Sequence, residues 1–314
     1  MERNLKSENK LQKHQACTGI ALFGEVLADV FPDKYVLGGA PYNVARHLNA
    51  FQFHPVLITR TGQDALKDEL LEEMIKMNMD TSGVQHDVKY PTGQVQVTLI
   101  EGNASYDILP DQAYDFISAG LTHMVLMSMK PEIIYFGTLA QRNLKSRLAL
   151  DQFLSEGKSP RFLDLNLRKP WFNKNTILRS LKRADIVKLN EDELEVVALL
   201  FSINGKDIQT KANTVLAQFA LKEVIVTCGS DGAWAFNHDG DAVYTKAAVI
   251  VDLIDTVGAG DAFAAVYIAG LIKGWRVSER LSRASSFASA ICSIRGAVPK
   301  DSSFYQPFKQ AWQL

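Results

Sequence analysis

Several features that whole functional classes require are scarce in this sequence of 314 residues. Its three cysteines, Cys17, Cys228 and Cys292, are odd in number and far apart. That argues against a disulfide framework or a zinc site and fits a cytoplasmic protein. The longest apolar stretch, residues 263–272, is about half the length that a membrane-spanning helix needs, so no membrane partner is expected. The net charge is −1, without a run of lysines or arginines, which argues against nucleic-acid binding.

The rest of the composition is typical of one soluble domain. Hydrophobic residues make up 47% of the chain and charged residues 22%, and no linker or low-complexity tract divides it. Residues 1–16 are polar and charged and lack the apolar core of a signal peptide, so we expect a flexible N-terminal tail. A single domain is therefore predicted over residues 17–314.

Short β-rich segments alternate with helical patterns along almost the whole chain. Buried strands are predicted at residues 20–24, 56–59, 133–136, 162–164, 186–189 and 224–227. Helices are predicted at residues 42–53, 64–77, 140–156, 176–184, 191–201 and 207–221. Repeated βα units imply a mainly parallel sheet with helices on both faces, which is a three-layer αβα architecture.

Two segments depart from this alternation. Val95, Val97 and Leu99 alternate with polar residues, and residues 101–103 then turn the chain into a second extended run. Residues 27–37 also lack a helical period. We expect segments near 27–37 and 92–110 to form a small β-sheet that lies as a lid over one edge of the main sheet. Ligands bind at the carboxyl ends of strands in such sheets, and most of the motifs below follow strands directly.

A glycine-rich turn at residues 255–263 leads directly into a predicted helix that ends near residue 273. Gly258 and Gly260 let the backbone approach a ligand closely, and exposed N–H groups at a helix start attract an anion. Asp261 could accept a proton from a hydroxyl, and the helix dipole is expected to keep its pKa low. An anion cradle beside a base suits phosphoryl transfer to an alcohol, although an Asp that only caps a core helix has the same pattern.

A second motif, residues 38–45, also opens a helix with glycines. Pro41 suits the first helical turn, and Asn43 could offer a sugar both a donor and an acceptor. Asp29, upstream at the end of a strand, could bind two hydroxyls. Taken singly, each of these features is also compatible with ordinary turn chemistry.

A third motif follows the strand at residues 162–164. Alternation along an extended segment would point Asp164, Asn166 and Arg168 in the same direction, where they could bind an anionic group or a polyol. A salt-bridge cluster at the surface is the alternative interpretation.

Two further motifs follow the next two strands. Asn190 and Glu193 either cap a helix or form an indirect magnesium site, because Mg²⁺ keeps waters and takes few carboxylates. Thr227, Gly229 and Gly232 either line a nucleotide or form a plain hairpin turn. No GxxxxGK[ST] motif occurs, which excludes a Walker-type site. Five polar or glycine-bearing motifs at one rim of the sheet favour a functional site over loop chemistry.

Together these residues resemble the ribokinase/PfkB family of sugar kinases over roughly residues 18–300. Residues 38–62 resemble its first signature and residues 255–263 its second. The resemblance implies a ribokinase-like sandwich with a small β-sheet lid, a small sugar and ATP as substrates, Mg²⁺ as cofactor, and K⁺ in some members. It also allows a homodimer that forms through the lid.

The resemblance implies a role for each motif. Asp261 is similar to the catalytic base, and the anion hole corresponds to Gly258, Ala259 and Gly260. Sugar contacts correspond to Asp29, Gly39, Asn43, Asn166 and Arg168. On the ATP side, the corresponding residues are Asn190, Thr227, Gly229 and Gly232. The metal-linked positions are Glu193, for Mg²⁺ bound indirectly, and Asp255, for a monovalent cation.

Within the family, three details favour a fructokinase. These are the Gly-Gly-Ala-Pro segment, the Asp-x-Asn-x-Arg segment at 164–168, and residues 135–140. Departures occur at Tyr42, Thr138 and Cys228, and the ring of Tyr42 could narrow the sugar pocket. The alternatives are a 2-keto-3-deoxygluconate kinase whose substrate contacts Arg168, a ribose or nucleoside kinase, and a regulator that binds sugar or nucleotide without turnover.

Overall fold

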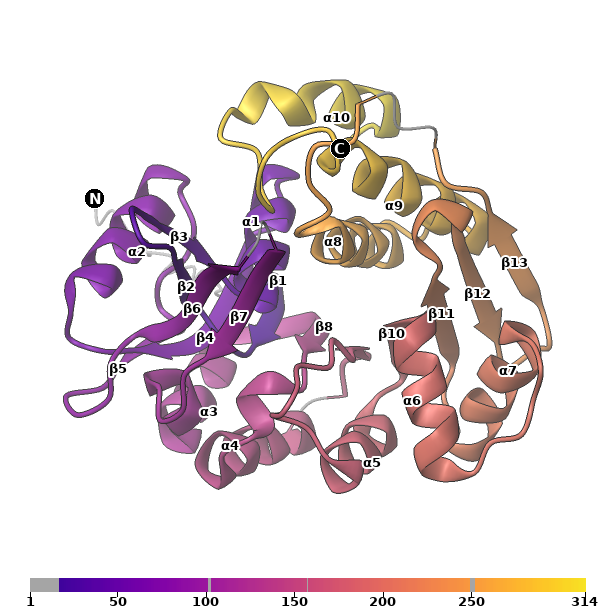
Figure 1. Ribbon diagram of the computed structural model, residues 1–314, viewed down its shortest axis with the longest axis horizontal. Coiled ribbons are helices and arrows are strands. Elements are labelled where there is room, and N and C mark those ends of the chain that lie inside the picture. The colour runs from indigo at the N-terminus through magenta and orange to yellow at the C-terminus, as the bar shows by residue number, and fades with distance from the viewer. Residues whose placement is uncertain (1–16, 101–102, 157, 249–251) are drawn as a thin grey trace, which may run out of the picture.

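The computed structural model describes residues 17–100, 103–156, 158–248 and 252–314 (Figure 1). The predicted N-terminal tail, residues 1–16, and part of the predicted turn, residues 101–102, lie outside these ranges. The strands form one sheet of nine and one of four.

The larger sheet is mainly parallel, as the alternation of strands and helices predicted. Its strand order is β13-β12-β11-β10-β9-β8-β1-β4-β5, and only β12 and β13 at one edge pair in the antiparallel direction. The bounds are β1 Cys17–Phe23, β4 Pro55–Thr61, β5 Val84–His86, β8 Met129–Phe136, β9 Arg161–Asp164, β10 Ile186–Asn190, β11 Glu223–Thr227, β12 Ala233–Asn237 and β13 Ala242–Thr245. All six predicted strands are present, whereas β5 and β13 were not predicted.

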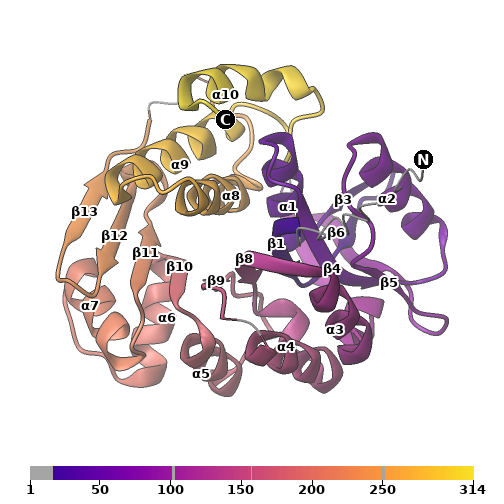
Figure 2. The same ribbon diagram turned by 180° about the vertical axis from the view of Figure 1, so that it is seen from behind.

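Helices cover both faces of this sheet, which gives the three-layer sandwich. One face is covered by α1 Ala40–Ala50, α2 Ala65–Lys76, α8 Ala259–Ile272, α9 Val277–Ile291 and α10 Gln306–Trp312. The other is covered by α3 Ala119–Ser128, α4 Leu144–Glu156, α5 Lys174–Arg183, α6 Glu191–Phe201 and α7 Ile208–Gln218. Both ribbon views place α8 and α9 on the opposite side from α4 and α5 (Figures 1 and 2). Strand β1 serves both cores, because Phe23 packs in one apolar cluster and Leu22 in the other.

Helices α9 and α10 were not predicted from the sequence, and neither was α3. Its segment is apolar nearly throughout, so it carries no amphipathic period that would identify a helix. Three of its apolar side chains, Leu121, Met124 and Met127, are exposed. The predicted helix at 140–156 begins later, because a 3₁₀ turn at Leu139–Gln141 comes before α4.

The smaller sheet is built from the two segments that broke the alternation. Its order is β3-β2-β6-β7, with bounds β2 Leu27–Val30, β3 Tyr35–Gly38, β6 Gly93–Ile100 and β7 Asn103–Ile108. Val95 and Val97 are buried on one face of the predicted hairpin, as is Ile108. Tyr106, which pairs with Val97 and so lies on the same face, is 52% exposed.

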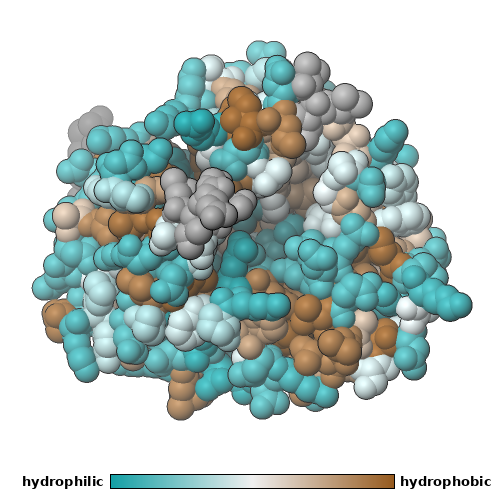
Figure 3. Space-filling view, in the orientation of Figure 1, coloured by the Kyte–Doolittle hydropathy of each residue, from teal (hydrophilic) through white to brown (hydrophobic). Residues whose placement is uncertain are grey.

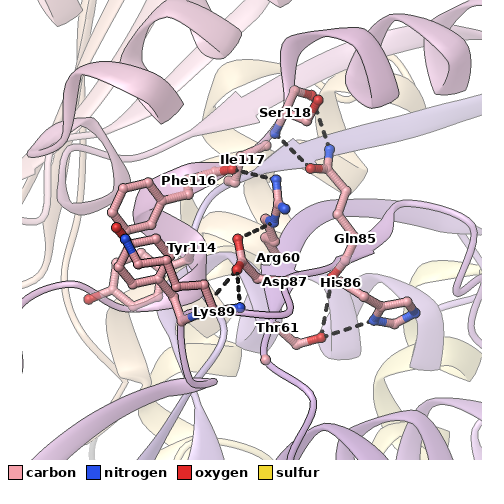
Figure 4. A network of polar contacts seen from close by, with 12 residues as sticks. Arg60, Thr61, Gln85, His86, Asp87, Lys89, Tyr114, Phe116, Ile117 and Ser118 are labelled. Carbon is pink, nitrogen blue, oxygen red and sulfur yellow. Dashed lines mark hydrogen bonds and ion pairs between the residues drawn. The ribbon is translucent and has the colours of Figure 1, made fainter.

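A network of polar contacts holds the chain that enters this sheet (Figure 4). Arg60, at the end of β4, pairs with Asp87 at 2.9 Å and donates to the Phe116 carbonyl oxygen at 2.8 Å. Asp87 also accepts hydrogen bonds from the backbone N–H groups of Lys89 and Tyr90. The segment between β5 and β6 is therefore fixed to the main sheet.

A second arginine holds the chain where it leaves the smaller sheet. Arg142 donates two hydrogen bonds of 2.7 Å to Asp115 and one of 2.6 Å to the Leu109 carbonyl oxygen. Both charged side chains are buried, at 6% and 2% exposure. A buried bidentate pair has a well-defined geometry, so the orientation of the smaller sheet is set at both ends of its hairpin.

Candidate active site

A cavity of about 1360 Å³ lies between the smaller sheet and the carboxyl ends of the main strands. The molecule is hollowed near the centre of this face (Figure 3). Its volume exceeds that of a pocket for one small ligand, so two substrates can fit side by side. The predicted site residues that line it are Asp29, Gly39, Asn43, Asn166, Arg168, Asn190, Glu193, Thr227, Gly229, Gly232, Gly258, Ala259, Gly260 and Asp261.

The two glycine motifs meet at one end of the cavity, although they are far apart in the sequence. Asn43 on α1 donates a hydrogen bond of 2.8 Å through Nδ2 to Oδ2 of Asp261 on α8. The chain can approach α1 this closely because Gly39, at φ 108°, carries no side chain. A Cβ at Gly39 would lie 2.8 Å from the Glu25 carbonyl oxygen. The start of α1 is therefore packed directly against the turn that follows β1.

Asp261 has a higher pKa than the helix dipole alone would give. It is half-buried, because one side faces the cavity while protein atoms surround the rest. Burial raises its pKa to about 6, and the negative charge of Asp164 adds to this effect. The hydrogen bond from Asn43 and the charges of Lys188 and Arg168 act in the opposite direction. The expectation of a low pKa was wrong, since desolvation outweighs the favourable helix terminus.

The turn before α8 is held by residues near the C-terminus. Gly258 has φ 80°, and a Cβ there would lie 2.4 Å from the Ala297 Cα atom. Asp255 accepts hydrogen bonds of 3.0 Å from the backbone N–H groups of Val257 and Gly296. Asp255 is not among the residues lining the cavity. In the described structure its hydrogen bonds fix the conformation of the turn on the side away from the cavity.

A buried ion pair behind this turn was not predicted. Lys188 on β10 lies 2.9 Å from Asp164 on β9, and the two side chains are 7% and 2% exposed. The Lys188 Nζ atom is 3.4 Å from the position that a Cβ on Gly260 would take. Burial by itself lowers the pKa of Lys188, but the charges of Asp164, Glu193 and Asp261 more than offset this and raise it. A positive charge therefore lies directly behind the anion cradle.

The sequence held a signal for this pair, namely a lone lysine in an otherwise apolar strand of four residues. The predicted geometry of the Asp-x-Asn-x-Arg segment was also wrong. Asn166 has φ 39°, so the chain is not extended there and simple alternation does not apply. Asp164 pairs with Lys188 in the interior and is not part of a surface cluster. Asp164, Asn166 and Arg168 nevertheless all line the cavity, as the prediction of a common direction requires.

Glu193 acts structurally as a clamp between two loops. Its Oε2 accepts a hydrogen bond from the Asn190 N–H at 2.9 Å, while Asn190 Oδ1 accepts one from the Glu193 N–H at 2.8 Å. This is a capping box at the start of α6. Its Oε1 accepts from the Leu167 N–H at 2.7 Å, which ties the loop after β9 to α6. Asn190 and Glu193 therefore both cap α6 and line the cavity.

The donor groups at the other end of the cavity suit a hydrated divalent cation better than a closed metal cage. Among the described residues, no group of three or more His, Cys, Asp or Glu side chains could hold a metal ion. Asn190, Asp192 and Glu193 line this part of the cavity, and Asn190 is the strand neighbour of Thr227, which the lining glycines follow. Mg²⁺ keeps several waters and is commonly bound by one or two carboxylates and substrate phosphates, which this arrangement allows.

No helix in the described ranges is both long enough and apolar enough to cross a membrane.

Comparison with known proteins relates the chain to carbohydrate kinases. A family model described as pfkB family carbohydrate kinase matches residues 11–302. An uncharacterized sugar kinase of Pyrococcus horikoshii is 28% identical over 244 residues, covering 75% of this chain and 73% of that protein. Its crystal structure in complex with ATP has a TM-score of 0.73 at 25% identity, over 91% of this chain and 97% of that one.

Fructokinases are also among the similar proteins. Fructokinase-2 of Oryza sativa is 26% identical over 309 residues, covering 89% of this chain and 90% of that protein. The fructokinase of Vibrio cholerae in its fructose, ADP and calcium bound form has a TM-score of 0.76 at 23% identity, covering 92% and 98% of the two chains. These structures confirm the predicted ribokinase-like fold.

Proposed function

The chain belongs to the pfkB family of carbohydrate kinases, and on this basis we propose that it is an ATP-dependent fructokinase. Membership of the family makes it a sugar phosphotransferase. The choice of fructose is supported by curated fructokinases that match 89% of the chain at 25–27% identity. The observation that carries the reaction is the hydrogen bond between Asn43 and Asp261, because it joins a sugar-binding motif to a base at the floor of one cavity.

In this proposal, Asp261 accepts the proton of the primary hydroxyl that receives the phosphoryl group. Asn43 occupies its Oδ2 atom, so Oδ1 is the oxygen presented to the substrate. A pKa of about 6 leaves Asp261 ionised at neutral pH while making it a better base than an exposed aspartate. Loose phosphoryl transition states place modest demands on the base, which fits this value.

Charge on the transferred group would be stabilised by the N-terminus of α8. The backbone of Gly258, Ala259 and Gly260 lines the cavity there, with the Lys188 ammonium group behind it. ATP would lie toward Asn190, Thr227, Gly229 and Gly232. When bound, Mg²⁺ would neutralise part of the phosphate charge. Asn190 and Glu193 lie on its side of the cavity. Asp255 is proposed to lie near a monovalent cation such as K⁺.

The sugar would lie under the smaller sheet, in contact with Asp29, Gly39, Asn43, Asn166 and Arg168. Burial raises the pKa of Asp29 to about 6, although Arg168 opposes this, so the carboxylate is ionised at neutral pH and can accept hydrogen bonds from sugar hydroxyls. The smaller sheet acts as a lid that limits the access of water. Its exposed Tyr35 and Val36 suit contact with a second copy in a homodimer.

A second candidate activity is 2-keto-3-deoxygluconate kinase. The observation that favours it is the guanidinium group of Arg168, which lines the sugar end and could bind a substrate carboxylate.

An ATP-consumption assay with a panel of acceptors tests the proposal. Fructose, 2-keto-3-deoxygluconate, ribose and adenosine are each supplied with Mg²⁺, with and without K⁺, and Asp261→Asn provides the background rate. The highest kcat/KM is expected for fructose. A higher kcat/KM for the sugar acid would overturn the assignment to fructose, and no sugar-dependent ATP consumption would overturn the proposed activity as a whole.

A further inference from the structure

Glu25 is a buried carboxyl group at the sugar end of the cavity, and neither the sequence motifs nor the proposed mechanism uses it. It lies in the turn between β1 and β2, is 4% exposed, and lines the cavity together with Asp29, Asn43 and Asp261. Its carbonyl oxygen packs against Gly39 at the start of α1. Its side chain is therefore located beside the first glycine motif.

One oxygen of this carboxyl group lacks a partner. Within the described part of the chain, Glu25 Oε2 makes no hydrogen bond, and the Oδ1 atom of the adjacent cavity residue Asn43 makes none either. Buried polar atoms normally have a hydrogen-bond partner, so these two oxygens in the cavity are available to a ligand that donates hydrogen bonds. An amide oxygen and a carboxylate oxygen only accept hydrogen bonds, and the groups that would satisfy them are donors such as hydroxyls.

The charges around Glu25 are mostly negative or already paired. Those facing it come from α8 (Asp261), from the loop after β9 (Arg168) and from the segment before α4 (Arg142). Tyr114 and Tyr135 also lie close enough to interact with its charge. Arg142 is committed to Asp115 by two hydrogen bonds. Three carboxyl groups, those of Glu25, Asp29 and Asp261, thus line the cavity, together with the cations Arg168, Lys169 and Lys188.

We propose that Glu25 is a specificity-determining residue that accepts hydrogen bonds from acceptor-sugar hydroxyls and, with Asp29 and Asp261, selects a neutral polyol over an anionic sugar. This inference rests on the proposed sugar site. A neutral sugar supplies donors to the two unsatisfied oxygens, whereas a carboxylate or phosphate at the same place supplies none. An anionic substrate would also bring like charges together in a partly desolvated cavity, which weakens its binding.

The pKa of Glu25 determines the pH at which its role in sugar binding is tested. Burial raises its pKa to about 7, with Asp261 adding to the shift and Arg168 and Arg142 opposing it. At pH 8 Glu25 is mainly ionised and therefore acts as an acceptor.

The test compares Glu25→Ala and Glu25→Gln with wild type at pH 8, using ATP consumption. Glu72→Gln on α2 is the matched control, because Glu72 is 69% exposed and lies away from the cavity. For Glu25→Ala, KM for fructose is expected to rise about 10- to 100-fold, the usual effect of losing hydrogen bonds to a charged group. KM for ATP should stay within about twofold of wild type, and the preference for fructose over 2-keto-3-deoxygluconate should fall at least about tenfold.

Glu25→Gln keeps the side-chain volume and one acceptor oxygen, so it gives a readout if the alanine variant does not fold. Its fructose KM should lie between those of wild type and Glu25→Ala, and its selectivity should shift toward the acid. An unchanged fructose KM and an unchanged sugar preference in a working fructokinase would overturn this inference alone. Wild-type preference for the anionic sugar would overturn both this inference and the proposed fructokinase activity.

Discussion

Replacing Lys188 by methionine should separate the structural and electrostatic roles of the buried ion pair. Methionine has a similar length but no charge, so Lys188→Met leaves the Asp164 carboxylate buried without its partner at 2.9 Å. Removing one member of a buried pair typically costs about 3–5 kcal/mol. That is a large part of the about 5–15 kcal/mol that stabilises a typical domain, so we expect a folded but clearly destabilised protein.

The double variant Lys188→Met/Asp164→Asn removes both charges. Asparagine keeps an oxygen that can accept the hydrogen bond from Tyr135, which lies 3.3 Å from Asp164. Most of the lost stability should return, so the double variant should be more stable than Lys188→Met by about 2 kcal/mol or more. The measurement is equilibrium unfolding in urea, followed by the fluorescence of the four tryptophans.

Turnover by the double variant decides whether Lys188 acts on the reaction. The ammonium group lies behind Gly260, and losing it should lower kcat by about tenfold or more in both variants, somewhat less than the loss of a direct anion-hole donor. A double variant that regains stability but not kcat would agree with this reasoning. A double variant with both wild-type stability and wild-type kcat would refute it, because the pair would then serve only the fold.

Three further outcomes follow from the geometry of the site. Gly258→Ala should lower the free energy of unfolding by about 1–3 kcal/mol and also lower kcat, because Gly258 has φ 80° and the new Cβ would overlap Ala297. An unchanged Tm and kcat would contradict the account of the turn. Asp29→Ala should raise the sugar KM and leave the ATP KM unchanged, whereas the reverse pattern would mean that the sugar end is misplaced. In a pH series, kcat/KM should fall as pH drops through about 7, where Glu25 becomes protonated, and a further fall should follow through about 6, because Asp261 must be ionised to accept a proton. In Lys188→Met this fall should move to higher pH, because Lys188 lowers the pKa of Asp261; a fall at unchanged pH would argue against that coupling.

The parts of the fold that sequence could predict are those with a strong local signal. Interior strands such as β10 and β11 read as short apolar runs because both faces of the sheet are covered. Helix α3 was missed because a uniformly apolar segment shows no period, whatever structure it adopts. The positive φ of Asn166 was also unpredictable, since a clamp from the distant Glu193 holds the neighbouring residue in that loop.

In the site, the residue types could be predicted but not their environment. The motifs around Asn43 and Asp261 were recognisable, yet the hydrogen bond between them spans 218 positions and depends on the tertiary fold. The raised pKa of Asp261 follows from burial, which a helix-terminus argument cannot supply. Lys188 and Glu25 were overlooked because a single charged residue in or next to a strand usually faces solvent.

The most direct test of the central claim is the turnover number of Asp261→Asn with fructose and ATP. Asparagine preserves the size of the side chain but cannot accept a proton at neutral pH. We expect kcat to fall about 10²-fold or more, with Tm and the KM for ATP close to wild type. A folded Asp261→Asn variant that turns over at nearly the wild-type rate would contradict the assignment of Asp261 as the base.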